Sequence, residues 1–292
     1  MRTALEAATG LRFRAASAPA SVGAGGGFAE CQRWESDAGP VFVKLAPIAR
    51  ELALEAEADA LRELATAQAV RVPRVLGFGT SGAQAFLALE WIEFGPVRPG
   101  TEAAFGEQLA RLHRVTAARF GWHRDNTIGA TPQPNAWDDD WVRFFRERRL
   151  GFQLDLAAAN GLEPRVVERG RDLGERCGAF FSSHRPVPSL LHGDLWGGNW
   201  GVVSGVREPA IFDPAVYYGD RETDIAMTRL FGGFGPRFYA AYQAAWPLDQ
   251  AAGTRRTLYN LYHVLNHFNL FGGGYGRQAA GMIDRLLAEF GA

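Results

Sequence analysis

The stretch that most constrains this 292-residue chain is an apolar pair followed by a turn rich in glycine and polar residues. It reads Leu-Leu-His-Gly-Asp-Leu-Trp-Gly-Gly-Asn over residues 190–199. A second short apolar segment follows and ends at Asp213. Asn199 therefore stands five residues after Asp194, and Asp213 nineteen residues after it.

This set of side chains is typical of phosphoryl transfer from ATP in kinase-like folds. One Asp positions the hydroxyl that is phosphorylated, while an Asn and a second Asp hold Mg²⁺. Mg²⁺ prefers hard oxygen ligands and usually takes only one or two carboxylates from a protein. We therefore expect Asp194 to be the catalytic residue that accepts or orients the hydroxyl, Asn199 and Asp213 to be metal ligands, and ATP and Mg²⁺ to be the cofactors.

The alternative is a structural turn, because Gly and Asp are common in turns of any protein. The apolar lead-in, the spacing and the second acid together favour the phosphotransferase interpretation. Protein kinases carry Arg before the catalytic Asp and Asp-Phe-Gly at the metal site. Here Gly193 precedes Asp194, and Pro214 and Ala215 follow Asp213, which indicates a kinase of small molecules.

Composition narrows the class of protein further. The chain is 47% hydrophobic and 22% charged, as in ordinary globular proteins. A net charge of −1 argues against nucleic-acid and membrane-surface binding, since both usually need a basic excess. Two cysteines are too few for a disulfide framework, and no apolar run has the length of a membrane span or a signal core. We therefore expect a cytoplasmic protein.

A glycine-rich run precedes a predicted strand pair near the start of the chain. Gly25, Gly26 and Gly27 stand before a strand predicted over 29–34, and the next strand, over 41–45, carries Lys44. Glycines let the backbone approach phosphate oxygens closely. Such a run alone is more often a flexible turn, but in kinases the lysine contacts the phosphates and is held by a Glu on a helix.

The sequence offers that Glu. Residues 51–65 read as a helix with three leucines on one face, and Glu57 lies within this apolar stripe. The other acids of the helix lie on the opposite side. An acid turned toward a core is costly unless it is paired, so we expect an ion pair between Lys44 and Glu57. The alternative places the Glu57 carboxylate at the edge of the stripe, in water.

Two further strands are predicted over 70–79 and 85–91. The second leads into a polar segment at 90–96, where a two-lobed kinase would cross from its small lobe to its large one. The backbone of Glu90, Trp91 and Ile92 would then hydrogen-bond adenine, although the segment itself indicates only a strand and a turn. We expect an N-terminal ATP-binding lobe over 1–92 and a C-terminal catalytic and substrate-binding lobe over 93–292.

The large lobe reads as mainly helical. Helices are predicted over 102–114 with Thr101 as the cap, 138–156, 165–182, 259–275 and 277–290, with a long polar and aromatic loop over 121–137. The fold class is therefore α+β, with a small antiparallel sheet lobe that carries one helix and a larger helical lobe. His113, near a helix end, is interpreted as structural.

Two segments are candidates for the acceptor site. Residues 217–227 carry three acids beside two tyrosines, which makes Tyr218 and Glu222 candidates for contact with a sugar or amine. A helix N-terminus favoured by acids explains the same residues equally well. In 259–275, His263, Asn266 and His267 share a side, and we take the two histidines as candidates. Buried, hydrogen-bonded core residues are the alternative.

Taken together, these segments resemble the fructosamine/ketosamine kinases, relatives of aminoglycoside phosphotransferases and choline kinases. The resemblance runs from about Gly25 to Tyr275. It rests on Phe-Val-Lys at 42–44, Arg-Val-Pro-Arg-Val-Leu-Gly at 71–77, Leu-Ala-Arg-Leu-His at 109–113, Arg-Asp-Asn-Thr-Ile-Gly at 124–129, Thr-Pro-Gln at 131–133, Leu-His-Gly-Asp-Leu-Trp at 191–196, Asp-Pro-Ala at 213–215, Tyr-Tyr-Gly at 217–219 and Leu-Phe-Gly-Gly-Phe at 230–234. Asp-Asn-Thr-Ile-Gly and Tyr-Tyr-Gly are far more specific than His-Gly-Asp, which many small-molecule kinases share.

The resemblance implies a two-lobed protein-kinase-like fold that uses ATP and Mg²⁺. It implies phosphorylation of the 3-hydroxyl of a ketosamine, the Amadori adduct of a sugar with a free or protein-bound amine. The 3-phosphate is then lost spontaneously, so the role would be deglycation repair, and we expect a monomer. Carried onto this chain, the resemblance makes Asp194 the base, Asn199 and Asp213 the metal ligands, Lys44 and Glu57 the phosphate-side pair, and Trp196 a wall of the substrate site.

Two positions depart from the family pattern. The residue after the three glycines, often Cys, is Phe28, which puts a redox switch of that loop in doubt. The residue after Tyr-Tyr-Gly, often His, is Asp220, which bears on acceptor preference. The rival interpretations are a kinase of another hydroxyl acceptor, such as an aminoglycoside or choline, and a nucleotide-binding protein without catalysis. The complete kinase side-chain set argues against the second rival.

Overall fold

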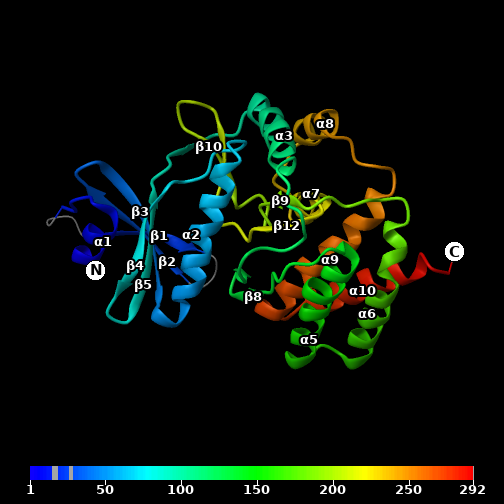
Figure 1. Cartoon of the computed structure of the whole chain (residues 1–292). Helices are drawn as coiled ribbons and strands as arrows, with labels where there is room; N and C mark the ends of the chain where they lie inside the picture. The colour runs from blue at the N-terminus through cyan, green and yellow to red at the C-terminus, as the bar shows by residue number, and fades with distance from the viewer. Residues whose placement is uncertain (15–18, 26–28, 292) are drawn as a thin grey trace.

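The computed structural model describes residues 1–14, 19–25 and 29–291, and it places a β-sheet at one end and most of the helices at the other (Figure 1). The sheet is antiparallel, with five strands in the order β1-β2-β3-β5-β4. Its strands are β1 (Ala20–Gly25), β2 (Ala29–Ser36), β3 (Gly39–Pro47), β4 (Val75–Ser81) and β5 (Gln84–Glu90). A short 3₁₀ turn, η1 (Ile48–Arg50), joins β3 to α2 (Glu51–Thr66).

Two helices cover the two faces of this sheet, where the sequence predicted a sheet lobe with one helix. Helix α1 (Arg2–Thr9) packs on the outer face, and α2 on the face toward the rest of the chain (Figure 1). Side chains alternate between the faces of a strand, so Val43 and Leu45 of β3 join the core under α1. Lys44, between them, faces α2, opposite Leu87 of β5 in the register.

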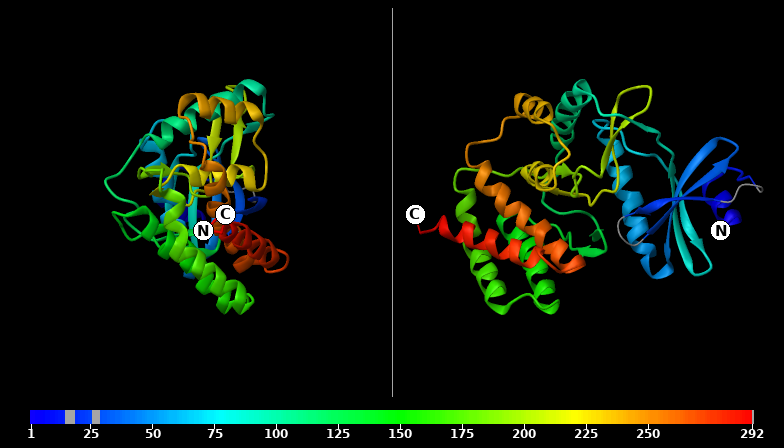
Figure 2. Two further views of the ribbon diagram at one scale, coloured as in Figure 1. Left: turned by 90° about the vertical axis from the view of Figure 1, so that its right-hand side faces the viewer. Right: turned by 180° about the vertical axis from the view of Figure 1, so that it is seen from behind.

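The larger part of the chain is mainly helical, as expected. Its helices are α3 (Pro99–His113), α4 (Trp141–Phe145), the π-helical segment η2 (Arg146–Gly151), α5 (Phe152–Ala159), α6 (Pro164–Arg176), the 3₁₀ segment η3 (Cys177–Phe181), α7 (Glu222–Leu230), α8 (Pro236–Ala245), α9 (Ala252–Phe271) and α10 (Tyr275–Ala288). Helix α9 packs against α5, α7 and α10, and α3 packs against α8 (Figure 2).

Short strand pairs lie between the sheet and these helices. They are formed by β6 (Phe94–Gly95), β7 (Asn126–Ile128), β8 (Thr131–Gln133), β9 (Ser189–Leu191), β10 (Trp200–Val203), β11 (Pro209–Ile211) and β12 (Tyr217–Gly219). Strand β9 pairs with β12, β10 with both β6 and β11, and β7 with β8. Strand β9 pairs with β12, which follows β11 in the chain. This pairing brings the turn after β9 close to the turn after β11.

Two local predictions are wrong at their boundaries. The strand predicted over 70–79 begins only at Val75, because Pro73 has no N–H to give to a ladder. Thr101 does not cap its helix: α3 begins at Pro99 with Arg98 as the N-cap, since proline presets the first helical position. The loop over 121–137 contains the β7–β8 hairpin, which the sequence pattern did not indicate.

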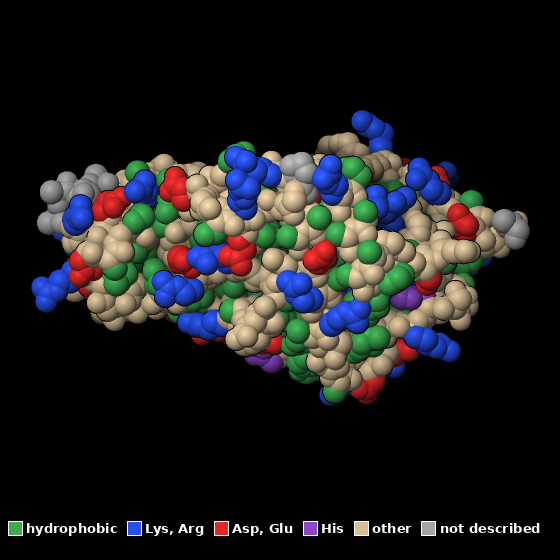
Figure 3. Space-filling model, turned by 90° about the horizontal axis from the view of Figure 1, so that it is seen from above, with side chains coloured by type: hydrophobic (Ala, Val, Ile, Leu, Met, Phe, Trp, Pro, Cys, Tyr) green, Lys and Arg blue, Asp and Glu red, His purple; other side chains and the backbone are tan. Residues whose placement is uncertain are grey.

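The surface mixes both signs of charge. Figure 3 shows acidic and basic side chains interspersed over the face seen from above. Among the helices that the structure describes, none combines the length and the apolar character needed to cross a membrane.

Candidate active site

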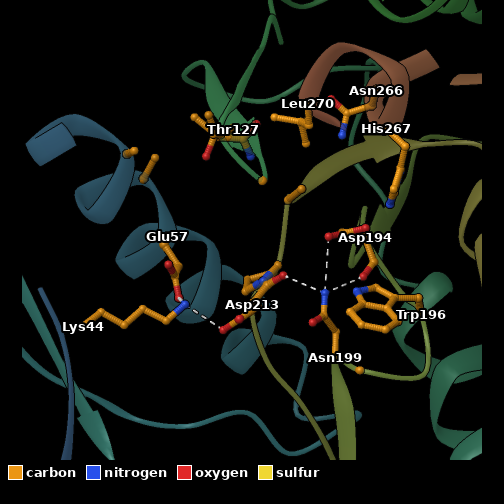
Figure 4. A pocket seen from close by; sticks show the side chains of 18 of the residues that line it. Lys44, Glu57, Thr127, Asp194, Trp196, Asn199, Asp213, Asn266, His267 and Leu270 are labelled. Atoms are coloured by element: carbon orange, nitrogen blue, oxygen red, sulfur yellow. Dashed lines mark hydrogen bonds and ion pairs between the residues drawn. The ribbon is translucent and has the colours of Figure 1, made fainter. Parts of the chain in front are cut away.

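A cavity of about 650 Å³ lies between α2, the turns after β9 and β11, the β7–β8 hairpin and the end of α9 (Figure 4). Lys44, Glu57, Asp194, Asn199 and Asp213 all line it. Figure 4 shows Lys44, Glu57 and Asp213 pointing toward one another, with Asn199 between Asp213 and Asp194. The structure thus brings together the five side chains that the sequence predicted for catalysis, phosphate binding and metal binding.

Glycine shapes the turn that carries Asp194. Gly193 has a φ of +84°, and a Cβ there would lie 2.0 Å from the carbonyl oxygen of Ala215. No other residue fits this approach, which is closed by a hydrogen bond of 2.8 Å from the Ala215 N–H to the His192 carbonyl. The turn after β9 is therefore held against the segment after Asp213.

Asn199 connects the two acids. Its Nδ2 donates to the main-chain oxygen of Asp194 at 2.9 Å and lies 3.3 Å from the Asp194 carboxylate. The same nitrogen lies 3.4 Å from the carbonyl oxygen of Asp213. The Oδ1 atom of Asn199 accepts no hydrogen bond from any described residue, so this oxygen is free to bind a cation.

Asp213 adopts a backbone conformation that is unusual for a residue other than glycine, with a φ of +55°. Strain of this kind collects at functional sites, where the surrounding structure holds it in place. Here His192 contributes, because its Nε2–H donates to the carbonyl of Phe212 at 2.9 Å. The result presents the Asp213 carboxylate to the cavity.

Lys44 forms ion pairs with two acids from distant parts of the chain. Its Nζ lies 2.6 Å from Glu57 and 2.7 Å from Asp213, and the lysine side chain is only 2% exposed. Burial alone would lower the pKa of Lys44, but the charges of Asp213 and Glu57 outweigh it and raise the pKa. Lys44 therefore keeps its positive charge beside the cavity, and the contact predicted between Lys44 and Glu57 is confirmed.

Asp194 lies partly buried at the centre of the cavity wall. Burial raises the pKa of Asp194 to about 7, and the charges of Asp213 and Asp224 act in the same direction, while the Asn199 amide opposes them. A carboxyl group with a pKa near neutrality can take up a proton from a hydroxyl and release it again. This property suits a general base.

Asp224, at the start of α7, holds the turn from behind. Its carboxylate accepts the main-chain N–H groups of His192 at 2.8 Å and Gly193 at 2.9 Å. His113 lies on its other side, with Nε2 at 3.1 Å from the carboxylate and Nδ1 at 2.8 Å from the Tyr242 hydroxyl. The structural interpretation of His113 is confirmed. Asp224 was not predicted as a site residue, yet its hydrogen bonds position the turn that carries Asp194.

A second hollow, of about 400 Å³, adjoins the cavity at Gly198 and Asp213. Its walls include Phe42 of β3 and Phe212, and its floor is the segment 89–94. The main-chain N–H and C=O of Ile92 make no hydrogen bond to a described residue, whereas the main-chain N–H of Glu90 already donates to the Arg74 carbonyl at 2.9 Å. Aromatic side chains around unbonded backbone N–H and C=O groups suit the binding of a planar nucleotide base.

The glycine-rich run is only partly described. Gly25 ends β1, whereas Gly26, Gly27 and Phe28 lie outside the described residues. Cys31, on β2, is buried, and burial raises the pKa of its thiol to about 11. Such a thiol stays protonated and unreactive at neutral pH.

The part of the cavity that the sequence predicts to bind the acceptor lies on the far side of Asp194 from Lys44. Trp196 and His267 both line it, with the Trp196 ring 40% exposed (Figure 4). Gly198 makes room for that ring, because a Cβ at this position would lie 2.3 Å from it. The Nδ1–H of His267 donates to the His263 carbonyl at 2.8 Å, which leaves the rest of its ring toward the cavity.

Three predicted acceptor contacts do not reach this cavity. Tyr218 gives its hydroxyl to Glu63 of α2 at 2.6 Å, and Glu222 is held by the two bonds of 2.8 and 2.9 Å from the buried Arg255. His263 is fully enclosed one helical turn before His267. The assignment of Tyr218, Glu222 and His263 as substrate contacts is therefore corrected: each lies in the core and is absent from the cavity wall.

Asp220 is also away from the cavity. It accepts hydrogen bonds from His184 at 2.7 Å and Tyr259 at 2.6 Å inside the helical core. The suggestion that this position tunes acceptor preference therefore has no direct contact to support it.

The cavity is also lined by residues that were not predicted as site residues, namely Thr127, Asn266, Leu270 and Phe271. Thr127 belongs to Asp-Asn-Thr-Ile-Gly at 125–129, a segment that is specific to the family which the sequence resembles.

Comparison with known proteins agrees with this geometry. A family model described as fructosamine kinase matches residues 2–289. A protein of Synechocystis sp. named "probable ketoamine kinase" is 48% identical over 250 residues, covering 84% of this chain and 82% of the relative. The chloroplastic protein-ribulosamine 3-kinase of Arabidopsis thaliana is 40% identical over 272 residues, covering 91% of this chain and 82% of the relative.

A solved structure has the same fold over nearly the whole chain. The protein from Haemophilus somnus, named "putative fructosamine-3-kinase", superposes with a TM-score of 0.89 at 30% identity, covering 98% of this chain and 96% of that one. The α+β kinase-like fold class predicted from the sequence is confirmed by this likeness.

Proposed function

The chain belongs to the fructosamine kinase family of phosphotransferases, and we propose that it phosphorylates the 3-hydroxyl of ketosamines with ATP. The observation that carries the proposal is the set of three hydrogen bonds by which Lys44 holds Glu57 and Asp213 and Asn199 holds Asp194, all in one cavity. The names of the relatives, ketoamine kinase and ribulosamine 3-kinase, support the substrate class.

The residues present fit ATP and Mg²⁺. The Oδ1 of Asn199 and the Asp213 carboxylate are hard oxygen donors on the same wall, in the number that Mg²⁺ usually takes from a protein. Lys44 offers a charge-assisted donor beside them, and the second hollow offers room for adenine against Ile92. When bound, ATP with Mg²⁺ supplies the phosphoryl group and neutralises the charge that develops during its transfer.

In this mechanism Asp194 orients the acceptor hydroxyl and takes its proton as the oxygen attacks. Asn199 holds Asp194 through its amide, and Asp224 fixes the backbone of the same turn. Lys44, kept in place by Glu57, contributes a positive charge on the phosphate side. The acceptor hydroxyl and the terminal phosphate of ATP would meet in this one cavity beside the Asp194 carboxylate, which is the proximity that direct transfer needs.

The acceptor side supports a sugar-like substrate. Trp196 presents an aromatic face, and Asn266 and His267 present polar groups next to it. Aromatic faces bind the apolar faces of sugars, while amide and imidazole groups bind hydroxyls. A ketosamine offers both kinds of surface. Loss of the 3-phosphate from the product would free the amine, so the physiological role that we propose is deglycation of small or protein-bound amines.

We also propose that the lobes meet at residue 92 and that the protein acts as a monomer in the cytoplasm. The sheet ends at Glu90, and the next helix begins at Pro99, which supports that boundary. Cys31 and Cys177 are buried and unpaired, as suits a reducing compartment.

The proposal is tested by measuring ATP consumption with Mg²⁺ against ribulose-lysine, fructose-lysine, an aminoglycoside and choline. Turnover on a ketosamine is the expected result. Turnover on the aminoglycoside or choline alone would keep the kinase chemistry and overturn the substrate. ATP binding without turnover on any of the four would favour a non-catalytic nucleotide-binding protein.

A further inference from the structure

A hollow of about 430 Å³ opens between α9 and α10, on the side of these helices where α7 ends. The two helices lie against each other over much of their length (Figure 2). None of the five side chains of the kinase cavity reaches this hollow. It is therefore a separate feature of the helical part of the chain.

Three arginines line the hollow: Arg256 of α9, and Arg277 and Arg285 of α10. None of them forms an ion pair with any residue that the structure describes, and no acidic side chain is part of the wall. The neighbouring Asp284 is turned away, because it pairs with Arg169 of α6. All three arginines are exposed, so their guanidinium groups can be reached by a ligand from solvent.

Asn260 provides a second, independent observation. It lies one turn after Arg256 on α9, lines the same hollow and is only 7% exposed. Its side chain makes no hydrogen bond to any described residue, and its Oδ1 is buried without a partner. Leaving a buried amide oxygen unsatisfied is costly, and a ligand that donates a hydrogen bond to this oxygen would remove that cost.

Gly281 keeps the hollow open. It stands in the middle of α10, between Arg277 and Arg285 on the same face, since these positions are four residues apart. A Cβ at this position would meet no atom within 4 Å, so close packing does not require glycine here. Glycine weakens a helix interior, and its effect at this position is to leave space above the helix surface.

From these observations we infer that the α9–α10 hollow binds a phosphate group, either as inorganic phosphate or on a small phosphate ester. Guanidinium groups bind phosphate oxygens in paired hydrogen bonds, and three of them match a dianion better than a single carboxylate. The Asn260 amide has both a donor for a phosphate oxygen and an acceptor for a hydroxyl of the ligand. This site goes beyond the proposed kinase function and does not depend on it.

The test is calorimetric titration of inorganic phosphate, and in a second arm of glucose 6-phosphate, into the whole protein. A non-hydrolysable ATP analogue with Mg²⁺ is present throughout, so that the phosphate positions of the kinase cavity are filled. Saturable binding of one ligand per chain is expected. Tighter binding of the ester than of inorganic phosphate identifies an ester as the ligand, and equal or weaker binding identifies inorganic phosphate.

Variants locate the binding. Arg277→Gln and Arg285→Gln should each weaken it about tenfold, because each removes a charged donor, and Asn260→Leu should weaken it as well. Gly281→Leu should fill the hollow and abolish binding while the melting temperature stays the same or rises, since leucine favours the helix. Arg165→Gln, at an exposed arginine of α6 with no ion pair among the described residues, is the matched control and should change nothing.

Absence of saturable binding would overturn the inference. Binding that survives Gly281→Leu, or that falls equally with Arg165→Gln, would overturn it too, because the phosphate would then sit elsewhere or respond only to net charge.

Discussion

The carboxylate of Asp224 accepts the main-chain N–H of His192 at 2.8 Å, so an acid on α7 fixes the turn that presents Asp194. Asp224 is 1% exposed and also accepts the N–H of Gly193. These two hydrogen bonds to a buried carboxylate fix the backbone of the turn, which keeps Asp194 in place relative to Asn199 and Asp213. Precision in catalysis here depends on a residue that never touches the cavity.

Asp224→Asn should therefore lower kcat by about 10- to 100-fold, because its amide keeps one acceptor oxygen but turns an NH₂ donor toward the other N–H group of the turn, and a charged hydrogen bond is lost. The KM for ATP should change little. The matched control is Asp220→Asn, which removes an equally buried acid that bonds His184 and Tyr259 instead of the turn. Steady-state kinetics of the two variants decide the matter: an equal loss of kcat in both would show a general effect on folding rather than positioning.

Asp194→Asn tests the base directly. Removing the proton acceptor should reduce kcat by about 10²- to 10⁴-fold, as is usual for the loss of a general base. Nucleotide affinity, measured by titration with an ATP analogue, should stay close to that of the wild type. Turnover near the normal rate would exclude Asp194 from this role.

Lys44 and Glu57 should behave as one unit. Lys44→Met removes the positive charge and should reduce kcat/KM for ATP by about 10²-fold or more. Glu57→Gln should cost less, since Asp213 still holds the lysine at 2.7 Å. The double variant should be little worse than Lys44→Met alone, because coupled residues are not additive. Additive losses would show that the two side chains act independently.

Trp196→Ala tests the acceptor side. Loss of the exposed ring should raise the KM for the acceptor about tenfold, with the KM for ATP unchanged. Trp246→Ala, at a tryptophan that stacks on Arg221 away from the cavity, is the control. A rise in the KM for ATP, with the KM for the acceptor unchanged, would show that Trp196 contacts the nucleotide and not the acceptor.

His184 should make stability depend on pH. Burial opposes its protonation, but the hydrogen bond to Asp220 and the charges of Asp220 and Glu222 outweigh burial and raise the pKa of His184. A raised folded-state pKa stabilises the fold fully below the unfolded value of about 6.5, and this contribution is lost as the pH rises through the folded-state pKa. The difference in unfolding free energy between wild type and His184→Gln should shrink from pH 5.5 to pH 8.5. Denaturant titrations across that range check it, and a difference that grows with pH would contradict it.

The sequence predicted the phosphate side of the cavity because physical constraints there are local. An acid in an apolar stripe demands a partner, which identified the contact of Glu57 with Lys44, and the spacing of Asp194 and Asn199 places both in one turn. The wrong strand start before Val75 and the wrong cap at Thr101 both came from prolines whose effect was overlooked.

The acceptor side was harder to predict, since it depends on how α9 is rotated against its neighbours. His263 and His267 are one turn apart and look equivalent in sequence, yet only His267 lines the cavity. In the sequence Glu222 cannot be distinguished from a surface acid, but in the structure it is buried and paired with Arg255, which is distant in sequence. Packing between helices decides such cases, and a single sequence does not specify it.

The central claim is tested most directly by incubating the protein with ATP, Mg²⁺ and ribulose-lysine and measuring ADP and free lysine in the same sample. Phosphorylation at the 3-hydroxyl predicts that free lysine appears after ADP and approaches the same amount, and that neither forms with Asp194→Asn. Formation of ADP with a stable phosphorylated product and no free lysine would contradict transfer to the 3-hydroxyl.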